Sequence, residues 1–139
     1  MSKSAFAALV VTLLCAAFGA LAMNHLMADD FVGKFKVMGN AEAPFLADEK
    51  GMSLYTFDKD PEGKSTCVAA CAEHFPPVLV VEGDMAMAPF SFITRDDGKR
   101  QWAIENRPMY LHAKDTAPGQ TNGRAVEGWT TVKVAAHEM

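Results

Sequence analysis

The chain has 139 residues, of which 50% are hydrophobic, and its formal net charge at pH 7 is −4. A chain of this length can bury one modest core and leaves no room for a large second domain. Because no run of lysines or arginines offsets the negative charge, we expect no nucleic-acid partner.

The first 23 residues have the pattern of an export signal. Lys3 is followed by an uncharged apolar run from Ala5 to Met23. The small residues of Ala20-Leu21-Ala22 stand where signal peptidase requires them, which predicts cleavage after Ala22 and a signal peptide over residues 1–22. The alternative is an uncleaved membrane anchor, because the apolar run approaches the roughly 20 residues that span a bilayer. Residues 5–23 would then contact the membrane.

Either form of the leader places the rest of the chain outside the cytoplasm, in the periplasm or cell envelope. Residues 23–33 show little periodicity and are interpreted as a tether. Residues 34–139 are predicted to form the folded domain.

This domain is predicted to consist mostly of β-structure. Short apolar or alternating runs predict strands, and the Asp97-Gly98 pair predicts a tight turn between two of them. The segment 66–75 has no internal helix breaker and ends at Pro76 and Pro77, which predicts one short helix. In chain order, the predicted elements are strands at 34–38, 44–48 and 52–57, the helix at 66–75, a buried strand at 78–81, hairpin strands at 90–95 and 100–105, a strand at 109–112 and a final strand at 129–134.

Two parts of the chain repeat each other at an offset of 55 residues. The aligned pairs are Tyr55 with Tyr110, Phe57 with His112, and Asp60 with Asp115. Residues two apart on a strand face the same side, whereas the aspartate falls in the following turn, where its carboxylate can accept backbone N–H groups. We therefore interpret the motif as structural. The predicted fold class is mainly β, with antiparallel hairpins from two related repeats, one short helix after the first repeat loop, and an N-terminal apolar helix before them.

The same residues carry a family resemblance. The run LYTFDKD is followed by STCVAACAEHFPPVLV, by DGKRQWAIENRPMYLHAKDTAPGQTNG and by a closing tryptophan segment. This order resembles the bacterial secreted-repeat lipoprotein family marked by a Y-x-[FWY]-x-x-D motif, and the likeness covers Phe45 to Val134. The resemblance implies an exported, often lipid-anchored protein whose biochemical role is unassigned. Two features depart from the family pattern, because Cys15 lacks a usable lipobox and His112 stands where an aromatic residue is usual.

Cys67 and Cys71 are the two cysteines outside the leader. At positions i and i+4 of the predicted helix they face the same side, and an exported protein meets an oxidising compartment. We therefore predict a structural disulfide between them and expect no cofactor.

Copper is the alternative. Thiolate and thioether sulfurs suit Cu(I), and the chain offers a Met-x-Met pair close after the C-x-x-x-C sequence. Methionine also fills irregular apolar gaps in ordinary cores, so the pattern leaves both interpretations open. The candidate copper ligands are Cys67, Cys71, His74, Met85, Met87, Met109 and His112.

Enzyme signatures are sparse. Ser53, Ser65 and Ser91 lack a nucleophile elbow, and no metalloprotease, phosphate-loop or dinucleotide motif occurs. We therefore expect no catalytic residues. The predicted function is that of a membrane-proximal, non-catalytic β domain that binds or supports another envelope or membrane protein, for example as an accessory subunit of a membrane complex. The alternative is a periplasmic copper-binding or thiol-redox protein.

Overall fold

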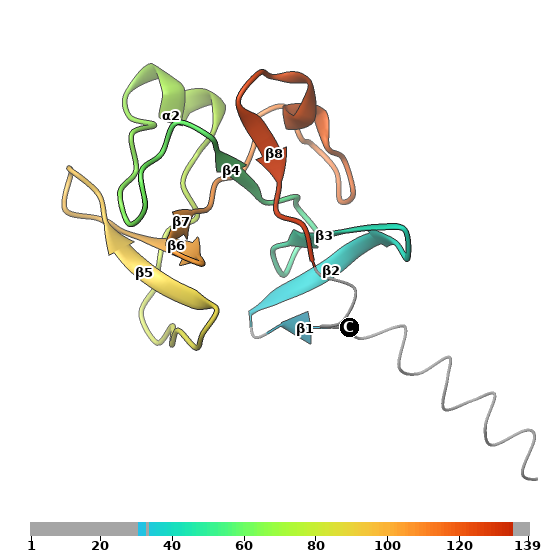
Figure 1. The fold of residues 1–139 in the computed structure, drawn as a ribbon, viewed down its shortest axis with the longest axis horizontal. Coiled ribbons are helices and arrows are strands. Elements are labelled where there is room, and N and C mark those ends of the chain that lie inside the picture. Colours follow the sequence, from blue (N-terminus) through green and yellow to red (C-terminus); the bar gives the residue numbers. More distant parts are fainter. Residues whose placement is uncertain (1–30, 33, 135–139) are drawn as a thin grey trace, which may run out of the picture. The chain divides into compact units, whose positions relative to one another are not determined.

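The computed structural model describes residues 31, 32 and 34–134. Over these residues the fold is mainly β with one short α-helix, which confirms the predicted class (Figure 1). The elements are β1 (Phe31–Val32), β2 (Phe35–Asn40), β3 (Ala43–Ala47), β4 (Tyr55–Phe57), α2 (Ala70–His74), β5 (Phe90–Thr94), β6 (Arg100–Ile104), β7 (Arg107–Pro108), the 3-10 helix η1 (Asn122–Ala125) and β8 (Trp129–Thr131). No helix among the described residues is long and apolar enough to cross a membrane. The predicted N-terminal apolar helix lies outside them.

The first sheet is an antiparallel arrangement of β1, β2 and β3 in that order. The β2–β3 hairpin runs from Lys36 opposite Ala47 to Asn40 opposite Ala43. The Asn40 side chain accepts hydrogen bonds from the backbone N–H groups of the next turn residues, which fixes the hairpin tip. Phe31 and Val32 form β1 here, although the sequence assigned both residues to the tether.

The β5–β6 hairpin forms where the Asp97-Gly98 pair predicts it. Its register runs from Phe90 opposite Ile104 to Thr94 opposite Arg100. Gly98 has a φ of 82°, a conformation that favours glycine, and its N–H donates to the carbonyl of Arg95 at 2.9 Å. The third strand, β7, follows a turn and pairs with the end of β6.

The two repeats are interleaved. β4 of the first repeat pairs with β8 of the second, from Tyr55 opposite Thr131 to Phe57 opposite Trp129. At the centre, the backbones of Tyr55 and Tyr110 exchange two hydrogen bonds with N···O distances of 2.8 and 2.9 Å. The two motif tyrosines are therefore neighbours, even though they are 55 residues apart in sequence.

Backbone hydrogen bonds on either side of this tyrosine pair occur in matched sets. Corresponding residues in the two sets are separated by about 55 positions, so the two halves of the domain are related by an approximate two-fold symmetry. Each repeat donates to, and accepts from, the other one. The matched bonds are Leu46 N–H to Val132 carbonyl (2.8 Å) with Trp102 N–H to Val78 carbonyl (2.9 Å), and Val132 N–H to Leu54 carbonyl (2.9 Å) with Val78 N–H to Met109 carbonyl (3.0 Å).

Several predicted elements are shorter in the structure. The segments 78–81 and 109–112 form isolated bridges, Leu79 with Gln101 and Tyr110 with Tyr55 and Pro77. Pro77 has no N–H group to extend its pairing with Tyr110 into a ladder. The helix predicted over 66–75 begins only after Ala69, whose φ of 54° is incompatible with a right-handed helix.

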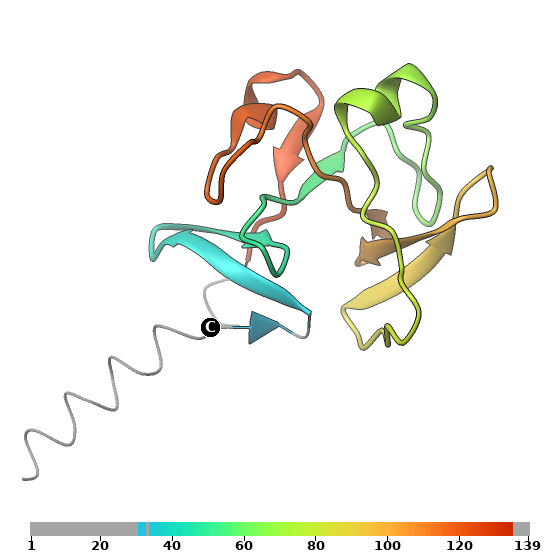
Figure 2. The same cartoon turned by 180° about the vertical axis from the view of Figure 1, so that it is seen from behind.

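Hydrophobic side chains from both repeats form two buried clusters. The larger cluster consists of Phe35, Leu46, Leu54, Val78, Phe90, Trp102, Met109 and Val132. The smaller cluster consists of Tyr55, Cys67, Phe75, Tyr110 and Trp129. Figures 1 and 2 show from opposite sides that α2 and η1 lie at one end of the domain, while β1 lies at the other. The fold thus brings the segments that follow the two Tyr–Asp motifs, which contain α2 and η1, together at one end.

Candidate functional site

Each motif tyrosine binds the motif aspartate of the other repeat. The Tyr55 hydroxyl donates to Asp115 at 2.6 Å, and the Tyr110 hydroxyl donates to Asp60 at 2.5 Å. Both tyrosines are fully buried. Burial, followed by the hydrogen bond to the carboxylate, raises the pKa of both phenols well above the usual value of 10.

The same aspartates close the loops that follow them. Asp60 accepts hydrogen bonds from the backbone N–H and the hydroxyl of Thr66, at 2.7 and 2.6 Å. Asp115 accepts a bond from the backbone N–H of Asn122 at 2.9 Å. We call residues 58–76 the first repeat loop and residues 113–128 the second repeat loop. Since each carboxylate is used inside the domain, the motif acts as a scaffold for these two loops.

The first repeat loop is held by a buried arginine that sequence reasoning missed. Arg95 donates to Ser65 Oγ at 2.8 Å, to Gln101 Oε1 at 2.8 Å and to the Cys67 carbonyl at 2.9 Å. Ser65 Oγ in turn lies 2.6 Å from the Tyr110 hydroxyl. Arginine is mostly exposed in proteins, so its position beside a hairpin turn gave no signal of this buried role.

The first repeat loop also contains the predicted disulfide, which the structure confirms. Cys67 and Cys71 are joined at an S–S distance of 2.02 Å. Cys67 is fully buried, whereas Cys71 is half-buried and faces the second repeat loop across a pocket.

Four rings pack in a row between the repeats, the first three nearly parallel and the last tilted by 30°, in what we call the aromatic column. Its order is Phe57, Trp129, Phe75 and His112, with successive centroid distances of 4.4, 3.6 and 4.5 Å. Phe57 and His112 are aligned by the repeat and occupy the two ends of the column. The imidazole therefore continues a stack that an aromatic residue would otherwise complete.

His112 differs from Phe57 in carrying hydrogen-bonding nitrogens. Its side chain is 7% exposed, and Nδ1 lies 3.2 Å from the backbone carbonyl of His74. Because a carbonyl oxygen can only accept, Nδ1 must carry the hydrogen of this bond. Neutral His112 thus presents an unprotonated Nε2 that makes no hydrogen bond to the described part of the chain.

A pocket of about 500 Å³ opens between the two repeat loops, and we call it the loop pocket. Trp129, Phe75 and His112 of the aromatic column contribute to its wall. The described residues that line it include cationic or titratable nitrogen groups but no acid. The complete lining is Cys71, His74, Phe75, His112, Lys114, Asn122, Ala125, Val126 and Trp129.

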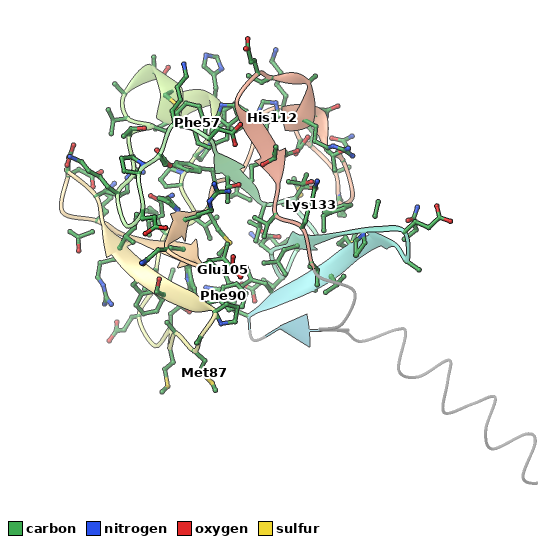
Figure 3. All side chains as sticks on the ribbon, in the orientation of Figure 1. Phe57, Met87, Phe90, Glu105, His112 and Lys133 are labelled. Atoms are coloured by element: carbon green, nitrogen blue, oxygen red, sulfur yellow. A yellow bond between two sulfur atoms is a disulfide. The ribbon has the colours of Figure 1, made fainter. Side chains whose placement is uncertain are left out.

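The structure does not bring the candidate copper ligands into one cluster. Met109 is fully buried in the larger hydrophobic cluster, and both cysteines are in the disulfide. Met87 and His112 lie far apart in Figure 3. Only Cys71, His74 and His112 share a pocket. Within residues 31, 32 and 34–134, no group of three or more His, Cys, Asp or Glu side chains is arranged to hold a metal ion.

Met85 and Met87 instead lie on an exposed segment, residues 82–89, which we call the methionine loop. Their side chains are 84% and 79% exposed. Asp84 anchors the loop by accepting hydrogen bonds from Lys34 Nζ at 3.0 Å and Trp102 Nε1 at 3.1 Å. Burial raises the pKa of Asp84, but hydrogen bonds from the Val81 backbone, Lys34 and Trp102 outweigh it and hold this pKa below its usual value.

Comparison with protein families decides the relationship of the chain to known proteins. A family model described as a secreted repeat of unknown function matches residues 42–79 and 91–133. The chain belongs to this secreted-repeat family. The family suggests an exported protein, and its two matched segments contain the two Tyr–Asp motifs. The methionine loop falls between the matched segments of the secreted repeat. No curated protein and no solved structure matches the chain.

Proposed function

We propose that the protein is a membrane-proximal, non-catalytic binding module of the cell envelope that docks onto another membrane protein through its methionine loop. The observation that carries this proposal is the combination of two exposed methionines with a fixed backbone. Exposed methionines are adaptable apolar contacts and are common on binding surfaces. Since Asp84 already holds the loop, less conformational entropy is lost when a partner binds.

The position of the Lys34–Asp84 ion pair supports docking of the methionine loop close to the membrane. Lys34, which pairs with Asp84, directly follows the segment that connects the apolar run 5–23 to the domain. If that run is a retained anchor, residues 24–33 can extend at most about 35 Å, which limits how far Lys34 can lie from the membrane. The methionine loop would then be close to the surface of a membrane protein.

The proposal of a non-catalytic role is supported by the use of polar groups inside the fold. Ser53 Oγ donates to the Gln120 carbonyl at 2.5 Å, and Ser65 belongs to the Arg95 network. Asp60 and Asp115 hold tyrosines and loop backbone. These hydroxyl and carboxylate groups stabilise the domain, and this structural role is sufficient to explain their presence.

The test is blue-native electrophoresis of native membranes solubilised in mild detergent. Wild-type protein is expected to migrate in a complex of defined size. The double variant Met85→Asp/Met87→Asp is expected to be released from this complex, because charges would replace the apolar contacts. Val68→Asp is the matched control, since Val68 is 43% exposed on the first repeat loop. Migration of the wild type as a free chain, or equal release of both variants, would contradict the proposal.

The copper or thiol-redox function is the second candidate, favoured only by the shared position of Cys71, His74 and His112 at the loop pocket. Copper binding would require reduction of the disulfide first, because a thiolate is the ligand. Titration of the reduced protein with Cu(I) against a competing chelator tests it. Stoichiometric binding that is lost in Cys67→Ser and in Cys71→Ser supports copper, and binding that is unchanged in Cys71→Ser excludes this site.

A further inference from the structure

We propose that the loop pocket binds a small aromatic carboxylate. This inference concerns the end of the domain away from the methionine loop and does not depend on the proposed docking function. It combines the shape of the pocket, its aromatic wall, its charge and the free nitrogen of His112.

The pocket has a suitable size and is held open by fixed elements. About 500 Å³ falls in the range of small-molecule sites, roughly 300–1,000 Å³. The disulfide fixes Cys71 on one side, and the Asp115 bond to the Asn122 N–H fixes the start of η1 on the other. A ligand would therefore meet a preformed site, which lowers the entropic cost of binding.

The wall of the pocket is suited to an aromatic ring. Trp129 and Phe75 lie at the centre of the aromatic column and both line the pocket. Val126, which is 41% exposed, and Ala125 supply further apolar lining. Both faces of these two rings are covered within the column, so an aromatic ligand would pack edge-on against them, which is a favourable arrangement.

The charge of the pocket favours an anion. Acidic residues outnumber lysine and arginine by 17 to 13 in the whole chain. The described lining nevertheless contains Lys114, His74 and His112 and no acid. An anion would be attracted to Lys114 at the pocket, while the adjacent Asp115 carboxylate is paired with the Tyr55 hydroxyl and the Asn122 N–H.

The nitrogen of His112 adds a specific contact. The imidazole is more than nine-tenths buried, its Nδ1–H is used by the His74 carbonyl, and Nε2 has no partner among the described residues. Ser91 Oγ is the one fully buried side-chain N or O atom without a partner in that part of the chain, so His112 Nε2 keeps access to solvent, and His112 lines both the loop pocket and a smaller neighbouring pocket of about 220 Å³. Neutral Nε2 accepts a hydrogen bond, which suits a hydroxyl on the aromatic ring.

The internal repeat provides matched controls for a binding experiment. Lys59 is the repeat counterpart of Lys114 at the 55-residue offset but does not line the pocket. Phe57 is the repeat counterpart of His112. The variant His112→Phe therefore keeps an aromatic ring in the column and removes only the ring nitrogens.

The experiment is isothermal titration calorimetry of the full protein with 4-hydroxybenzoate, benzoate and 4-hydroxybenzamide. We expect saturable binding of 4-hydroxybenzoate, weaker binding of benzoate and the weakest binding of the uncharged amide. Lys114→Gln should weaken 4-hydroxybenzoate binding about fivefold through loss of a partly exposed ion pair, while Lys59→Gln leaves it unchanged. His112→Phe should weaken 4-hydroxybenzoate about fivefold through loss of one hydrogen bond, without affecting benzoate.

Two results would overturn the inference. One is the absence of saturable binding to the folded wild-type protein at millimolar ligand. The other is equal weakening by Lys114→Gln and Lys59→Gln, which would show that binding follows net charge and does not occur in the loop pocket. Circular dichroism of each variant establishes that the domain remains folded.

Discussion

The first and second repeat loops share one closing device but are stabilised differently. In both loops, the carboxylate of an aspartate accepts a hydrogen bond from a backbone N–H six or seven residues further on, which closes the loop. The tyrosine of the other repeat donates a second hydrogen bond to that aspartate. The first repeat loop has in addition the disulfide and the buried Arg95. The second repeat loop has neither and instead brings Gly123 against the Tyr55 ring.

This difference shows which parts of the repeat define the fold and which are free to vary. The Tyr–Asp pair is present in both halves, so it suffices to close a loop in either context. The remaining loop residues can then specialise. The second repeat loop supplies Lys114, Ala125 and Val126 to the loop pocket, while the first repeat loop forms a rigid opposite wall with Cys71.

The largest expected effect comes from removing the extra support of the first repeat loop. Arg95→Met should reduce the free energy of unfolding by about 3 kcal/mol, because buried acceptors on Gln101 and Cys67 lose charged hydrogen bonds. Arg100→Met is the control, since the exposed Arg100 lies over the Phe92 ring and should contribute about 0.5 kcal/mol. Urea denaturation measures both, and equal midpoints for the two variants would contradict the role of Arg95.

The two tyrosine–aspartate pairs should differ in strength. Tyr55→Phe should cost about 2 kcal/mol, because Asp115 is only 6% exposed and would lose a partner that water cannot easily replace. Tyr110→Phe should cost about 1 kcal/mol, because the half-buried Asp60 can be hydrated. Thermal and urea unfolding of the two variants test this order, and a larger loss in Tyr110→Phe would reverse the comparison.

The disulfide should stabilise mainly the first repeat loop. The double variant Cys67→Ala/Cys71→Ala should lose about 2 kcal/mol, as expected for closing a short loop. Amide hydrogen exchange should increase in residues 66–75 and stay unchanged in residues 122–126. Equal loss of protection in both loops would mean that the cross-link supports the whole domain.

Ionisation of the two tyrosines is expected to have the smallest effect on the free energy of unfolding at neutral pH. Their folded-state pKa values are raised, so the stabilisation is fully present below about pH 10 and is lost as the pH rises above it. Each tyrosine should lower the free energy of unfolding by about 1.4 kcal/mol per pH unit in that range. Tyr110→Phe should halve the slope, and an unchanged slope would show that its phenol is not protected.

The sequence predicted the elements of the repeat but not how the two copies meet. The 55-residue offset correctly aligned Tyr55 with Tyr110 and placed Asp60 in a turn. It gave no sign that each tyrosine reaches the other copy, because an internal alignment reports equivalence and carries no information on contact.

The candidate sites show the same limit. The disulfide could be predicted because Cys67 and Cys71 are local to one loop, although the helical spacing used to predict it was wrong, since α2 begins at Ala70 and Cys67 lies outside it. The loop pocket combines residues from two loops that are far apart in the chain, so no local sequence pattern could predict it. Arg95 was missed because its acceptors are a distant hydroxyl, a distant carbonyl and a side chain across the hairpin.

The interleaving of the repeats is the central claim, and a double-mutant cycle tests it most directly. Urea denaturation would be measured for Tyr55→Phe, Asp115→Ala and the double variant, and in parallel for Tyr55→Phe with Asp60→Ala. The structure predicts a coupling energy of about 1–2 kcal/mol for Tyr55 with Asp115 and additive effects for Tyr55 with Asp60. Additivity in the first cycle with coupling in the second would mean that each tyrosine pairs within its own repeat, which would contradict the interleaved fold.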